Sequence, residues 1–142
     1  MKNEIDLEIT VPNQTCYLKL IGRIGEDMAR ELDLLKGDSE SLAHHLNMVL
    51  TEAMANAIKH ATAADPDNEV HISIKISEQE LVIKVFDCGP GFNLDDVPDP
   101  SFEVYPLNEK GRGIFIIRSL MDTVIYKKTN GGNVLVMKKS LG

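Results

Sequence analysis

The sequence is poor in cysteine and has no excess of basic residues. Cys16 and Cys88 are far apart, with neither metal-ligand nor C-x-x-C spacing, which predicts two reduced thiols. The formal net charge of −7 argues against a nucleic-acid-binding surface, because such a surface needs a basic stripe. The overall charge still leaves local recognition of a phosphate group open.

Long apolar runs are also missing. No segment approaches transmembrane length and no signal-peptide hydrophobic region is present, so we expect a soluble, cytoplasmic protein that does not bind a membrane. The 142 residues, 43% hydrophobic and 26% charged, are typical of a globular domain that buries a core without metals or disulfides. We therefore expect a single domain over residues 1–142.

Apolar periodicity predicts the order of the elements. Alternation predicts strands at residues 5–11, 70–76, 81–87, 123–129 and 134–139. Three- and four-residue spacing predicts helices at residues 15–35, 39–61 and 114–121. The resulting β-α-α-β-β-loop-α-β-β order predicts an α+β fold, a two-layer sandwich with helices on one face of a mixed or antiparallel sheet.

Polar residues recur at four-residue spacing near the end of the second predicted helix: Glu52, Asn56 and His60. Residues four apart stack on one side of a helix, so a carboxylate and an amide project side by side. A solvated stripe is an ordinary explanation of such a pair. Two glycine-centred motifs follow in a fixed order, at residues 87–91 and 111–114, and they favour a functional site.

The strand at residues 81–87 carries Asp87 on the same face as its apolar residues, the face that helices are expected to cover. A buried carboxylate without a donor is costly, so a backbone amide, a buried water or the N–H of a ligand must satisfy it. Gly89 and Gly91 follow directly. They either allow the backbone to approach a ligand or form a simple turn around Pro90.

Residues 92–110 have no clean period and contain three prolines and five acidic residues. A loop of this length is usually a lid, a binding loop or a disordered segment, and we expect a lid. Gly111-Arg112-Gly113 then opens the short helix, where backbone amides are free to meet phosphate. Lys110 and Arg112 are the nearest cations, and they either pair with phosphate or stay solvated.

Taken together, the motifs E-x-x-x-N-A-x-x-H, D-x-G-x-G and G-x-G resemble those of the GHKL ATPases, which include gyrase, Hsp90, histidine kinases and MutL. The short chain is similar to the bacterial anti-sigma factor serine kinases. The resemblance covers nearly all 142 residues. Each motif alone is weak, but three in order at domain-sized spacing form a strong signal. The resemblance implies the same two-layer fold.

The resemblance also implies roles for three residues. Asn56 would ligate Mg²⁺ through its side-chain oxygen, which suits a hard ion bridging protein and nucleotide phosphates. Glu52 would act as general base on the attacking hydroxyl of a serine or of water. Asp87 would accept a hydrogen bond from the adenine amino group, which guanine lacks at that position, so ATP would be preferred over GTP.

The glycines would shape the pocket around the nucleotide. Gly89 and Gly91 would let the backbone approach the base, whereas Gly111 and Gly113 would hinge the lid and seat the phosphates. The last strand departs from the family pattern, because Asn133 stands where many relatives place a threonine. That departure puts one phosphate or water contact in doubt.

The leading hypothesis is an ATP-dependent protein serine kinase that acts as an anti-sigma factor. The resemblance implies a homodimer that binds a sigma factor in one state and phosphorylates a small STAS-type antagonist. A second hypothesis is a nucleotide-gated module that holds a partner without phosphoryl transfer, and the intact Glu52 argues against it. A third is an ATPase domain detached from a larger machine, which the lack of transducer domains and of a phospho-acceptor histidine helix disfavours.

Overall fold

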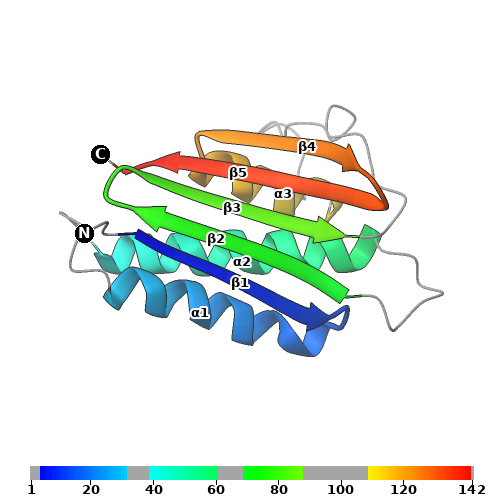
Figure 1. Cartoon of the computed structure of the whole chain (residues 1–142), viewed down its shortest axis with the longest axis horizontal. Coiled ribbons are helices and arrows are strands. Elements are labelled where there is room, and N and C mark those ends of the chain that lie inside the picture. The colour runs from blue at the N-terminus through cyan, green and yellow to red at the C-terminus, as the bar shows by residue number, and fades with distance from the viewer. Residues whose placement is uncertain (1–3, 32–38, 61–68, 88–108, 142) are drawn as a thin grey trace.

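Within the residues that the structure describes, five antiparallel strands form one sheet, and three helices cover one of its faces. The computed structural model describes residues 4–31, 39–60, 69–87 and 109–141. The elements in chain order are β1 (Glu4–Pro12), a 3-10 turn (Thr15–Tyr17), α1 (Leu18–Glu31), α2 (Ser39–His60), β2 (Glu69–Ser77), β3 (Glu80–Asp87), α3 (Glu109–Leu120), β4 (Thr123–Thr129) and β5 (Gly132–Ser140). The strand order is β1-β2-β3-β5-β4, and Figure 1 shows all three helices behind this sheet. The predicted two-layer α+β sandwich is confirmed in its antiparallel form.

The main difference from the predicted elements concerns α3. This helix begins at Glu109 rather than at Ile114, so the segment from Lys110 to Gly113 belongs to its first turns. Two glycines lower helix propensity by about 1 kcal/mol each, and the prediction therefore placed them before the helix. Packing of α3 against α2 overrides that local preference. The rest of the predicted lid and the pair Gly89 and Gly91 lie outside the described residues.

The core lies between the sheet and the helices. On β2 and β3 every second residue is buried, as the alternation predicts. The predicted apolar face of α2 is buried as well: Leu42, Leu46, Val49, Leu50, Ala53 and Ala57. Burial of each large apolar side chain stabilises the folded state by about 1.5–3 kcal/mol. This face therefore fixes the rotation of α2 about its axis. In the described part of the chain, no helix has the combined length and apolarity needed to cross a membrane.

Two glycines explain how closely α1 approaches α2. A Cβ atom on Gly25 would lie 2.5 Å from Leu50 Cδ1, and one on Gly22 would lie 2.8 Å from Asn47 Oδ1 and 2.9 Å from Thr51 Oγ1. Both glycines are buried in α1. They cost helix propensity, but they let the two helices pack at short distance.

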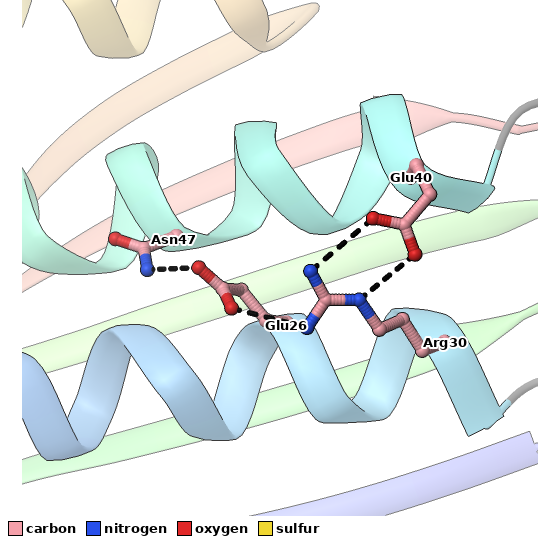
Figure 2. Close-up of polar contacts among 4 residues, drawn as sticks. All are labelled: Glu26, Arg30, Glu40 and Asn47. Atoms are coloured by element: carbon pink, nitrogen blue, oxygen red, sulfur yellow. Dashed lines mark hydrogen bonds and ion pairs between the residues drawn. The ribbon is translucent and has the colours of Figure 1, made fainter.

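A polar network ties the exposed sides of α1 and α2 together (Figure 2). Arg30 Nε donates to Glu40 Oε1 at 2.9 Å and Arg30 Nη1 donates to Glu26 Oε2 at 3.2 Å, while Asn47 Nδ2 donates to Glu26 Oε1. The hydrogen bond and charge of Glu40 raise the pKa of Arg30 above its usual range. Since the Arg30 side chain is 44% exposed, solvent screens these interactions and they orient the helices more than they stabilise them.

The hairpin between β4 and β5 sets the register that matters for the site. Thr129 pairs with Gly132, so the loop has two residues, and Gly131 has a φ of 93° that favours glycine. β5 begins at Gly132, two residues before the predicted start at Val134. The longer strand places Asn133 directly opposite Asp87 on β3.

Candidate nucleotide-binding and catalytic site

Glu52 and Asn56 lie one turn apart on α2, as predicted. Their neighbours Ala53 and Ala57 are buried in the core, whereas Glu52 and Asn56 are themselves half-buried. The pair therefore lies at the border between core and solvent, where a carboxylate and an amide oxygen are accessible to a substrate. His60 is the last residue of α2, and its side chain lies outside the described part of the structure.

The carboxylate of Glu52 lies directly against α3 at Gly113. A Cβ atom on Gly113 would lie 2.8 Å from Glu52 Oε2, which is closer than Cβ atoms approach other atoms in proteins. The absence of a side chain at this position therefore leaves room for the Glu52 carboxylate. Two residues that the motifs singled out independently, one from each helix, are thus brought into contact.

The first turn of α3 contains the remaining predicted phosphate-binding residues, Lys110, Gly111 and Arg112. The first four N–H groups of an α-helix have no partner within the helix, and in α3 these groups belong to residues 109–112. They carry the positive end of the helix dipole, which favours a bound anion. The side chains of Lys110 and Arg112 lie outside the described part of the structure. That they either pair with phosphate or stay solvated therefore remains a prediction.

Asp87 ends β3 and is buried with 7% of its surface exposed, as its place in the alternation predicts. Asn133 Nδ2 donates a hydrogen bond to Asp87 Oδ1 at 3.0 Å. Tyr126 on β4 donates from its hydroxyl to Asp87 Oδ2 at 3.5 Å, the long limit of a hydrogen bond. Two side chains thus donate to this carboxylate, a source that the sequence analysis did not consider beside a backbone amide, a water or a ligand.

Sequence reasoning treated Asn133 only as a missing threonine and did not single out Tyr126. The signal that could have found both is strand register. With β5 extended to Gly132, Asn133 pairs with Asp87, and Tyr126 pairs with Leu135, two residues further along β5. Side chains two residues apart on a strand lie on the same face, which brings Tyr126 within reach of Asp87.

The described residues contain no group of three or more His, Cys, Asp or Glu side chains that could hold a metal ion. Mg²⁺ is usually bound by one or two protein oxygens together with substrate phosphates. The side-chain oxygen of Asn56 is a hard oxygen donor of that kind.

The chain matches known proteins over almost its full length. A sequence profile described as the histidine kinase-like ATPase domain matches residues 13–139. The serine-protein kinase RsbW of Bacillus subtilis is 30% identical, with 97% of this chain and 88% of that protein covered. An anti-sigma F factor of Bacillus cytotoxicus is also 30% identical, with 99% of this chain and 94% of that protein covered.

Solved structures show the same fold. The catalytic domain of the histidine kinase ThkA matches with a TM-score of 0.57 at 16% identity, covering 95% of this chain and 97% of that one. A histidine kinase domain from Erythrobacter litoralis matches with a TM-score of 0.55 at 20% identity, covering 92% of this chain and 62% of that one. At these identities the likeness concerns the fold.

The expected enzyme class, an ATP-dependent protein serine/threonine kinase, is confirmed at the level of the family, and ATP is the nucleotide that this family implies. This chain belongs to the histidine kinase-like ATPase family, within the group of bacterial serine-protein kinases and anti-sigma factors.

Proposed function

We propose that this protein is a cytoplasmic anti-sigma regulatory factor that phosphorylates a STAS-type antagonist on serine. In one of its states the protein also sequesters a sigma factor. It acts as a homodimer and does not bind nucleic acid itself. The names of its relatives, a serine-protein kinase and an anti-sigma factor, support both halves of this proposal.

The proposed kinase activity is supported mainly by the contact between α2 and α3. Glu52 and Asn56 are one turn apart on α2, and the Glu52 carboxylate rests on Gly113 of α3. The first N–H groups of α3 have no partner within the helix, and such groups can bind phosphate. A base, a metal-binding oxygen and an anion-binding helix end are therefore supplied by two packed helices.

This chain's residues perform little covalent chemistry, because phosphoryl transfer depends mainly on positioning and charge stabilisation. The serine Oγ forms a bond to the γ-phosphorus of ATP, the bond from that phosphorus to the β–γ bridging oxygen breaks, and ADP leaves. Glu52 takes the serine proton. Asn56 would hold Mg²⁺, which when bound neutralises charge on the phosphate oxygens.

Base selection falls to Asp87 on the sheet. Its carboxylate can accept a hydrogen bond from the adenine amino group. Guanine has a carbonyl oxygen at that position, and a carboxylate facing it would repel it. A site that is built to hydrogen-bond one group strongly rejects an analogue lacking it.

Affinity capture from the native lysate, with and without Mg-ATP, tests this function. The captured proteins are identified by mass spectrometry and then incubated with the parent protein and γ-labelled ATP. We expect a sigma factor and a small antagonist among them, with label on a serine of the antagonist. The Glu52→Gln variant is the matched control, since it should capture the same proteins and label none.

Two results would contradict the proposal in different ways. Nucleotide-dependent capture without any labelling would favour the nucleotide-gated binding module. Labelling of a captured protein in the absence of any sigma factor would leave the kinase in place and remove the anti-sigma role.

A further inference from the structure

Asn133 is a buried polar residue in an otherwise apolar part of β5. It is 2% exposed, and the four residues after it, Val134 to Met137, are all buried and apolar. Asparagine is depleted in strands, and burying an unpaired amide is costly. Its presence there therefore points to a specific task, and its contact with Asp87 shows where that task lies.

The bond from Asn133 to Asp87 is the stronger of the two described hydrogen bonds to this carboxylate. Its length is 3.0 Å, against 3.5 Å for the bond from Tyr126. Because Asp87 and Asn133 also face each other across the strand pair, the backbone fixes the position of the donor. A donor held in this way restricts rotation of the carboxylate and determines where its remaining acceptor positions point.

We propose that Asn133 is a positioning residue for nucleotide selection: by donating to Asp87 Oδ1, it holds the carboxylate in the orientation that accepts the adenine amino group. This inference rests on the proposed role of Asp87 in binding ATP. It gives Asn133 a place in the selectivity of ATP over GTP without contact between Asn133 and the nucleotide. It also gives a role to the residue that replaces the family's threonine, because Asn133 donates directly to Asp87, the carboxylate proposed to bind adenine.

A purely structural role predicts something different. If Asn133 only satisfied a buried charge, its loss would destabilise the fold, and the affinities for ATP and GTP would fall together or not at all. If Asn133 orients Asp87, its loss lowers the affinity for ATP, which uses the carboxylate, and does not lower the affinity for GTP, which cannot use it. The ratio of the two affinities separates the two roles.

The test compares three variants of the full chain by calorimetric titration with Mg-ATP and Mg-GTP. Asn133→Leu keeps a similar volume and removes the donor. Asn133→Thr keeps a hydroxyl donor at the same position. Val136→Ala is the matched control, because Val136 is 9% exposed on the same strand and its truncation lowers stability away from Asp87. Melting temperatures are recorded for all.

We expect Asn133→Leu to lower the ATP-over-GTP affinity ratio by roughly tenfold, the effect of losing a hydrogen bond to a charged group. Asn133→Thr should retain most of the ratio. Val136→Ala should melt at a lower temperature with the parent ratio.

The possible failures are distinguishable. If the parent protein binds ATP and GTP equally, the role of Asp87 in the proposed function is wrong and this inference falls with it. If the parent prefers ATP and Asn133→Leu keeps that preference, the inference is overturned while the proposed function stands. Loss of the ratio in both Asn133 variants would also contradict it, because a retained donor would then make no difference.

Discussion

The two carboxylates of the site, Glu52 and Asp87, lie in contrasting surroundings. Glu52 is half-buried on α2, and its carboxylate rests against the backbone of Gly113. Asp87 is 7% exposed at the end of β3 and accepts hydrogen bonds from Asn133 and Tyr126. One carboxylate is half-buried on a helix and packs against a glycine, whereas the other is buried and held by donors from neighbouring strands.

We propose that this contrast corresponds to two different tasks. A general base must reach an attacking hydroxyl and exchange a proton with it, which suits an accessible side chain at a helix surface. A carboxylate that distinguishes two bases must hold one orientation, which suits a buried group with fixed donors. We therefore assign phosphoryl transfer to the α2–α3 contact and selection of the nucleotide base to the β3–β5 contact.

The largest expected effect comes from Glu52→Gln, which keeps the shape of the side chain and removes its basicity. Turnover should fall by about 10²–10⁴-fold, the usual contribution of a general base, while the affinity for Mg-ATP stays near the parent value. Rates of label transfer and calorimetric titration measure the two quantities. Unchanged turnover would show that Glu52 is not the general base, and it would contradict the separate roles of Glu52 and Asp87.

Gly113→Ala sharpens the assignment of Glu52 by changing only its neighbour. The added Cβ atom would lie 2.8 Å from Glu52 Oε2, so the carboxylate must move. A displacement of about 1 Å in a catalytic group can cost up to about 10²-fold, and we expect kcat to fall more than KM for ATP rises. Ser119→Ala, at an exposed position of the same helix, should leave both constants unchanged. Equal kcat in the two variants would show that the contact has no catalytic role.

Asp87→Asn tests the other half of the comparison. It should reduce ATP affinity by roughly 1–3 kcal/mol, the range for a lost or mispaired hydrogen bond to a charged group, and should reduce the preference over GTP. The control is Asp122→Asn, which changes an exposed carboxylate between α3 and β4 that accepts a hydrogen bond from Ser140 N at 2.6 Å. Calorimetry measures the binding constants. Equal constants in the two variants would contradict the role of Asp87 in binding adenine.

The smallest effect is expected at the exposed network between α1 and α2. Arg30→Gln removes the ion pairs with Glu26 and Glu40, and the melting temperature should fall only slightly. In about 1 M salt, where the Debye length is about 3 Å, the difference from the parent should shrink further. Nucleotide affinity and turnover should not change, and a change in either would show that the polar contacts of α1 reach the site.

Much of this arrangement could be predicted because it follows from periodicity. The alternation along β3 placed Asp87 on the helix-covered face, and the four-residue spacing on α2 placed Glu52 beside Asn56. The apolar face of α2 was predicted for the same reason. Burial of apolar surface is the dominant favourable contribution to folding. The apolar periodicity of a sequence therefore predicts which face of a helix or strand is buried.

The parts that could not be predicted depend on contacts between segments distant in sequence. Gly25 lowers local helix propensity, and only its contact with Leu50 of α2 explains its place. The Glu52–Gly113 contact joins two helices, and the Asp87–Asn133 bond depends on the register of β3 with β5. Local propensity carries no information on such pairings.

The central claim, that the two carboxylates have separate tasks, is tested most directly by calorimetric titration of the double variant Glu52→Gln/Asp87→Asn with Mg-ATP. If Glu52 serves only the chemical step, the double variant should bind Mg-ATP with the dissociation constant of Asp87→Asn alone, within about twofold, the scatter expected for independent sites. A further loss of affinity well beyond that, caused by Glu52→Gln, would show that Glu52 also holds the nucleotide and would contradict the account.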